Sequence, residues 1–163
     1  MCNILFRAKA INRDKGYHKT KYKNGDWVYG LVTRLYDERF ENLPAEMTDI
    51  NGVSGIEVDY KTIGQYTGLT DKNGVRIFEG DIVRATIERA ERCQSPRIEN
   101  GVIGYDCIGM IGLILYKDKN GENVWSDFFN ELSLSGLIED YYFEIIGNIH
   151  DNPEILKGGE ENG

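Results

Sequence analysis

The sequence contains little of what a disulfide-bonded or zinc-bound fold requires. Its 163 residues include three cysteines, Cys2, Cys93 and Cys107, and none of them belongs to a CxxC pair. Because a disulfide framework uses an even number of cysteines and a zinc ribbon uses CxxC pairs, we expect neither. The three cysteines are instead typical of reduced thiols in a cytoplasmic protein.

Long apolar segments are also missing. Residues 1–7 lack the apolar run of a signal peptide, and no segment approaches the ~20 apolar residues of a membrane span. The most apolar window, residues 104–116, is interrupted by Asp106 and three glycines. We therefore expect a protein of the cytoplasm that does not enter a membrane.

Motifs for catalysis or cofactor binding are absent from the sequence. It has two histidines, His18 and His150, and the sequence assigns neither of them a catalytic partner. No GxSxG, Walker, Rossmann, HExxH or kinase motif occurs. We therefore predict no catalytic, cofactor-binding or metal-binding residues, a pattern more typical of a binding module than of an enzyme.

The tetrapeptide Asp-Lys-Asn-Gly occurs twice, at residues 71–74 and 118–121. It resembles the opening of a calcium-binding EF-hand loop, which needs Gly at its sixth position and Glu at its twelfth. Counted from Asp71, the fourth position is Gly74 and the twelfth is Ile82. The spacing therefore excludes an EF-hand, and both tetrapeptides are predicted to form turns.

A second group of acidic residues leaves an enzymatic alternative open. Glu79 and Asp81 flank Gly80, and with Asp106 and Asp127 they could supply the carboxylates of a metal-dependent hydrolase. The sequence does not bring these residues together. The simpler interpretation is that Gly80 makes a turn and Asp81 caps it.

Glycine and aromatic residues, by contrast, are plentiful. Nineteen glycines against three prolines indicate many turns, and ten tyrosines and six phenylalanines favour strands. Gly30 lies inside one expected strand, where it indicates a bulge or a close backbone approach. The expected strands are residues 4–10, 27–36, 56–59, 62–67, 81–89, 102–106, 109–116, 124–125 and 141–149.

Strands at this spacing, joined by glycine-rich turns, predict a mainly β protein with a small SH3-like or open β-barrel. We expect one domain over residues 1–157, with an N-terminal β extension over 1–67 and the barrel-like part over 68–150. A short C-terminal helix is expected after the N-cap residue Asn152. Residues 158–163 are expected to form a disordered tail.

The acidic net charge of the chain favours another protein over nucleic acid as its binding partner. The formal net charge is −8, and an acidic chain repels a polyphosphate backbone. One basic element nevertheless alternates cations with an aromatic ring, a pattern that can contact single-stranded nucleic acid. The alternative interpretation is a solvated hairpin rim or an edge strand that lysines protect. The residues of this possible nucleic-acid contact are Lys19, Lys21, Tyr22 and Lys23.

Several longer motifs point to a family. The chain contains IGQYTGL at 63–69, DKNG at 71–74 and IFEGDIV at 77–83. ILFRA occurs at 4–8 and WVYG at 27–30, and the closing segment, residues 143–156, reads FEIIGNIHDNPEIL. These motifs resemble the YopX family of phage and prophage proteins. Lys9 stands where the opening strand of that family, of the KFRAW type, usually has Trp.

Most positions of the motif at 63–84 are turn or core residues, so the motif can be a folding signature. The core candidates are Tyr66, Leu69, Ile77, Phe78 and Val83. The structural motif residues are Gly68, Asp71, Gly74, Gly80 and Asp81. A localised function is therefore expected in the loops at 37–55 and 89–100 or in the basic N-terminal hairpin.

The resemblance implies a small, mainly β protein that a phage or an integrated prophage of a low-GC bacterium encodes. It implies action in the host cytoplasm and allows for a homo-oligomer, and it supplies no catalytic residues. We therefore expect an accessory protein that binds a host or phage macromolecule, protein rather than nucleic acid. A nucleic-acid-binding small barrel and a metal-dependent hydrolase are the alternatives.

Overall fold

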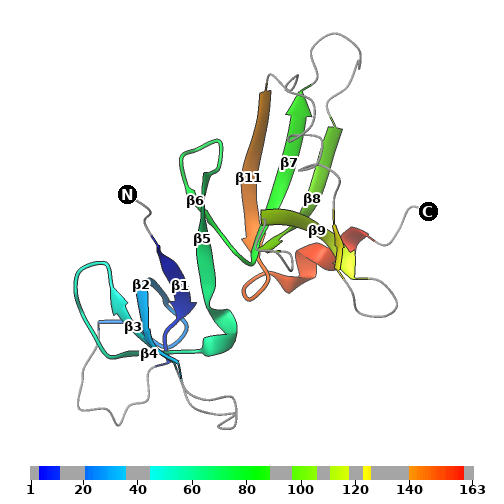
Figure 1. Ribbon diagram of the computed structural model, residues 1–163. Coiled ribbons are helices and arrows are strands. Elements are labelled where there is room, and N and C mark those ends of the chain that lie inside the picture. Colours follow the sequence, from blue (N-terminus) through cyan, green and yellow to red (C-terminus); the bar gives the residue numbers. More distant parts are fainter. Residues whose placement is uncertain are drawn as a thin grey trace. The chain divides into compact units, whose positions relative to one another are not determined.

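The chain divides into two compact units, Met1–Tyr66 and Thr67–Gly163. The computed structural model describes residues 4–11, 21–35, 45–88, 97–105, 111–117, 123–125 and 140–159. Its strands form two sheets, one of six strands and one of five (Figure 1). The prediction of a mainly β protein is confirmed.

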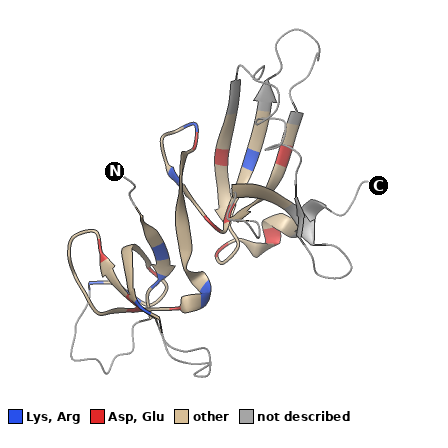
Figure 2. Ribbon diagram, viewed as in Figure 1, with Lys and Arg blue, Asp and Glu red and all other residues tan. Residues whose placement is uncertain are grey.

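Charge divides unequally between the two units. Met1–Tyr66 holds ten Lys and Arg against nine Asp and Glu, whereas Thr67–Gly163 holds nine against eighteen. Figure 2 marks these positions in the described residues. The acidic excess of the chain therefore belongs to the second unit.

The six-stranded sheet has the order β4-β3-β2-β1-β5-β6. Strand β1 lies opposite β2 with Ala8 facing Val28, and opposite the start of β5 with Arg7 facing Gly64. A 3-10 turn, η1 (Tyr60–Thr62), precedes β5. The strands are β1 (Phe6–Lys9), β2 (Trp27–Arg34), β3 (Ala45–Asp49), β4 (Ile56–Val58), β5 (Gly64–Thr70) and β6 (Arg76–Phe78).

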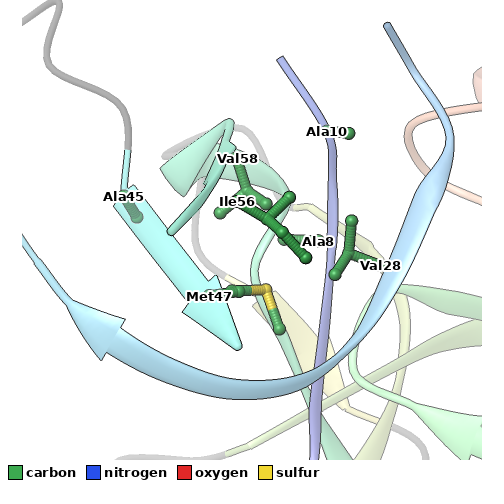
Figure 3. Packing of buried hydrophobic residues seen from close by; sticks show 7 residues of the cluster. All are labelled: Ala8, Ala10, Val28, Ala45, Met47, Ile56 and Val58. Atoms are coloured by element: carbon green, nitrogen blue, oxygen red, sulfur yellow. The ribbon is translucent and has the colours of Figure 1, made fainter. Parts of the chain in front are cut away.

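Small and medium-sized apolar side chains form the core of the first unit. Ile56 and Val58 on β4 lie close to Val28 on β2 and Met47 on β3 (Figure 3). An isolated bridge joins Ala10 to Val58 and so links the end of β1 to β4. The alternation of β2 puts Val28 in this core and leaves its neighbours on the outer side.

Gly30 confirms the expected close backbone approach on β2. It lies opposite Asp49 of β3. A Cβ atom on Gly30 would overlap the carbonyl oxygen of Thr48. A side chain at this position therefore has no space unless the two strands separate.

The five-stranded sheet of the second unit has the order β10-β9-β8-β7-β11. One face buries a cluster that includes Val83 and Ala85 of β7, Phe143 of β11 and Ile77 of β6. Leu69 packs against this cluster, and Phe78 is also buried. The strands are β7 (Asp81–Glu88), β8 (Arg97–Tyr105), β9 (Ile111–Lys117), β10 (Asn123–Trp125) and β11 (Asp140–Asn148).

Two details of the expected fold differ from the structure. The described strands form no closed barrel, and the expected SH3-like barrel is not confirmed. The expected C-terminal helix is a 3-10 helix, η2 (Pro153–Gly159). A Cβ atom on Gly147 would lie 2.7 Å from Cδ1 of Ile155, so glycine lets η2 pack closely on β11.

Within the described residues, no helix is long and apolar enough to cross a membrane. The expected turn at 118–121 and residues 160–163 of the expected tail lie outside the described residues, whereas residues 158 and 159 of that tail belong to η2.

Candidate functional site

The turn after β5 is built around the carboxylate of Asp71. Its Oδ1 accepts hydrogen bonds from the backbone N–H of Asn73 at 2.8 Å and of Val75 at 2.9 Å. Gly74, with a φ of 79°, donates its N–H to the carbonyl of Asp71 at 2.9 Å. Burial on its own would raise the pKa of Asp71, but the N–H groups of Val75 and Asn73 outweigh burial and lower it. The carboxylate therefore anchors the turn.

The turn after β3 repeats this arrangement, which sequence reasoning missed. Oδ1 of Asp49 accepts the N–H of Asn51 and the N–H of Val53, each at 2.9 Å. Gly52, with a φ of 84°, donates its N–H to the carbonyl of Asp49 at 2.9 Å. Both turns have the sequence Asp-x-Asn-Gly-Val. The sequence therefore contained the signal for this turn, but as a pattern with one variable position and not as an identical tetrapeptide.

Two residues of the predicted nucleic-acid contact bind Asp49. The hydroxyl of Tyr22 donates to Oδ2 of Asp49 at 2.8 Å, and Nζ of Lys21 lies 3.1 Å from the same oxygen. The Tyr22 side chain packs against the core of the first unit, and Nζ of Lys21 lies 5.0 Å from its ring centroid. Both side chains thus stabilise the turn after β3.

This contact shifts the pKa of all three groups. Burial raises the pKa of the Tyr22 hydroxyl, and the hydrogen bond to Asp49 raises it further. The pKa of the Lys21 ammonium group is raised by its hydrogen bond to Asp49. For Asp49, burial alone would raise the pKa, but the N–H of Val53 and the Tyr22 and Lys21 donors hold it well below its usual range. The ion pair is therefore charged at neutral pH.

Of the other two residues of the predicted contact, the structure describes Lys23 alone. The backbone N–H of Lys23 donates to the carboxylate of Asp26 at 2.7 Å in the next turn. Lys19 lies outside the described residues. Nucleic-acid binding by this element stays a prediction.

The turn between β6 and β7 is held by Asp81 and Asn148. Asp81 is 1% exposed, and its Oδ2 accepts the N–H of Phe78 at 2.8 Å. Nδ2 of Asn148 donates to the carbonyl of Gly80 at 2.9 Å and to Oδ1 of Asp81 at 3.3 Å. The N–H of Ile149 donates to the same carbonyl at 3.0 Å. The IFEGDIV segment and the closing segment are therefore joined by hydrogen bonds.

The Asp71 turn also contacts β11. The N–H of Lys72 donates to the carbonyl of Phe143 at 2.8 Å, and the N–H of Ile145 hydrogen-bonds to the Asp71 carboxylate. Nζ of Lys72 lies 3.0 Å from Glu144, which also lies 3.6 Å from Arg84. Figure 2 shows this basic position on β7 beside the acidic one on β11.

Of the acidic residues in the hydrolase alternative, the structure describes Glu79 and Asp81. Glu79 lies near Tyr105, whose pKa is raised by burial first and then by the charge of Glu79. In the part of the chain that the structure describes, no three His, Cys, Asp or Glu side chains are grouped so that they could hold a metal ion. Asp106 and Asp127 lie outside that part.

The outer face of the first unit carries exposed aromatic and aliphatic side chains. We use this term for the side of β1, β2 and β3 that points away from the core. Tyr29 is 37% exposed and Leu31 is 51% exposed, and both alternate with core-facing residues of β2. Ile50 is 65% exposed, and its N–H donates to the carbonyl of Tyr29 at 2.9 Å.

Two cations, Arg7 and Lys9, lie on the outer face beside Trp27, at the start of β2. The guanidinium of Arg7 lies 4.6 Å and Nζ of Lys9 lies 4.7 Å from the ring centroid of Trp27. Arg7 faces Tyr29, and Lys9 faces Trp27, across the β1–β2 pair. The outer face thus combines an indole, a phenol and two aliphatic side chains with two positive charges.

Fold and site together define a mainly β protein of two units in which the carboxylates of Asp49, Asp71 and Asp81 anchor turns. The family model described as YopX protein matches residues 6–157, so the chain belongs to the YopX family. The crystal structure of protein EF1440 from Enterococcus faecalis is 28% identical; the match covers 81% of this chain and 90% of that one, with a TM-score of 0.36. No curated protein matches.

Proposed function

We propose that the protein is a non-enzymatic accessory protein of a phage or prophage. In this proposal it acts in the cytoplasm of the bacterial host and binds another protein through the outer face of the first unit. Assembly of its own copies into a homo-oligomer is compatible with that role.

The observation that supports the proposal is the row of Trp27, Tyr29 and Leu31 along β2. Trp, Tyr and Arg are the residues that most often contribute large binding energies at protein interfaces. The exposed fractions of Tyr29 and Leu31 leave these side chains accessible. Ile50 extends the row just after β3 (Ala45–Asp49), a strand that lies where a functional loop at 37–55 was expected.

The composition of the face favours protein over nucleic acid. Its cations are Arg7, which is only 7% exposed, and Lys9, whose Nζ donates to the carbonyl of Gly25 at 3.2 Å. A phosphate backbone is held mainly by accessible cations, whereas apolar side chains such as Leu31 and Ile50 gain free energy only from apolar contacts. We therefore expect a partner surface with apolar side chains.

The test places a photo-crosslinking amino acid at position 29 in cells infected with the phage or carrying the prophage. We expect it to capture a protein that Leu31→Asp no longer captures. A hot-spot contact at the centre of an interface is worth ~2 kcal/mol or more, about thirtyfold in affinity.

The matched control is Ile98→Asp, because Ile98 is 56% exposed on β8 of the second unit. It should retain full capture. Equal capture by the wild-type protein and by Leu31→Asp would show that the partner binds elsewhere.

A further inference from the structure

Strand β11 lies at one side of its sheet as the structure describes it, so one of its edges pairs with no described strand. It pairs with β7 from Asp140 to Asn148, and within the described residues it is the outermost strand on that side. The open edge of a strand presents backbone N–H and C=O groups to which another strand can add. The sequence of β11 contains Tyr-Tyr-Phe-Glu-Ile-Ile, in which every residue except Glu144 has a high preference for strands.

Part of this edge is covered by the turn Asp71–Val75. In an antiparallel strand, the backbone groups of alternate residues point to the same edge. Phe143 and Ile145 are two residues apart, and both bond to the turn: Phe143 through its carbonyl to Lys72, and Ile145 through its N–H to Asp71. The turn therefore fills two positions that an added strand would use.

We propose that the turn Asp71–Val75 is an edge cap that prevents a second copy of this chain from adding a strand to β11. The DKNG motif at 71–74 would then have a role separate from the proposed partner binding, because it lies in the second unit and the outer face belongs to the first. In addition to the backbone hydrogen bonds, the ion pair between the side chains of Lys72 and Glu144 holds the cap in place.

The turn Asp49–Val53 offers an internal comparison. The N–H of Ile50 donates to the carbonyl of Tyr29 at 2.9 Å, which corresponds to the bond from Lys72 to Phe143. Strand β2, however, lies between β1 and β3. The bond from Ile50 therefore continues an existing strand pair and covers no open edge.

The test is Lys72→Pro, with Ile50→Pro as the matched control. Lys72 occupies the second position of its turn, where proline is favoured in type I turns. Proline removes the N–H that bonds to Phe143 and also the ammonium group. Ile50→Pro removes the corresponding bond in the other turn.

We expect the Ile145 amide of Lys72→Pro to exchange with solvent about tenfold faster than in the wild-type protein, the size of roughly one lost hydrogen bond. Sedimentation should show an average mass that rises with concentration more steeply than for the wild-type protein. Ile50→Pro should sediment like the wild-type protein.

Two results would overturn the proposal. One is a folded Lys72→Pro that sediments like the wild-type protein, and the other is equal association by both proline variants. If Lys72→Pro fails to fold, Lys72→Glu decides. It keeps the N–H but sets two like charges side by side, so it should increase both exchange at Ile145 and association, and no increase would equally contradict the cap.

Discussion

At the scale of single residues, Gly30 shows how a backbone approach fixes a residue type. Two kinds of glycine occur in the described chain: those with a positive φ in turns, such as Gly25 at 88°, and those that leave space for a neighbour. Gly25 has open space where its Cβ would be, whereas that of Gly30 would overlap the carbonyl of Thr48. The two positions should therefore respond very differently to the same substitution.

We predict that Gly30→Ala lowers the free energy of unfolding by more than about 3 kcal/mol, because the clash is with backbone that cannot rotate away. Gly25→Ala should cost only about 1–2 kcal/mol, the strain of a positive φ. Urea denaturation followed by tryptophan fluorescence measures both. Similar losses in the two variants would mean that β2 and β3 separate easily.

At the scale of elements, the sequence predicted strands and turns well where local chemistry decides them. The positive φ of Gly74 and Gly80 follows from turn sequences that are recognisable by themselves. The partner of each turn was not predictable, because contacts such as Asn148 to Gly80 join residues 68 positions apart. The same holds for Tyr22, whose hydroxyl partner Asp49 depends on strand register.

The expected nucleic-acid element illustrates the limit. The alternation of lysine and tyrosine along the sequence does not show which of these side chains will contact a residue elsewhere in the fold. The structure gives Lys21 and Tyr22 the buried carboxylate of Asp49. The outer face around Leu31 was missed as a candidate because exposed and buried strand faces look alike when both are apolar.

The two Asp-x-Asn-Gly-Val turns should make stability depend on acid. The pKa of Asp71 and of Asp49 is lowered in the folded protein. Such groups contribute stability above the unfolded-state pKa of about 3.9, and this contribution is lost as the pH falls through the folded-state pKa. We predict that Asp71→Asn lowers the free energy of unfolding by about 1–2 kcal/mol at pH 7.

The same variant should lose less additional stability than the wild-type protein when the pH falls below about 4. Denaturant titrations at a series of pH values between neutral and strongly acidic conditions measure this difference. Parallel curves for Asp71→Asn and the wild-type protein would show that other carboxylates cause the acid sensitivity.

At the scale of the whole molecule, the division of charge bears on the choice of partner. The second unit carries twice as many acidic as basic residues, while the first unit is nearly balanced. Long-range repulsion from an acidic unit lowers the rate at which a polyanion approaches. A nucleic-acid contact through the basic element would have to overcome this field with few cations, one of which, Lys21, is already paired with Asp49.

We therefore predict that single- and double-stranded DNA and RNA show no stable complex in gel shifts at about 0.15 M salt, where charges more than ~8 Å apart are screened. Any complex at low salt should respond equally to Lys23→Glu and to Lys61→Glu, because both replace one cation of the first unit by an anion. A complex that survives at the higher salt and is weakened by Lys23→Glu alone would assign nucleic acid to the basic element. Such a result would leave the Leu31→Asp crosslinking experiment to decide whether the outer face binds a protein as well.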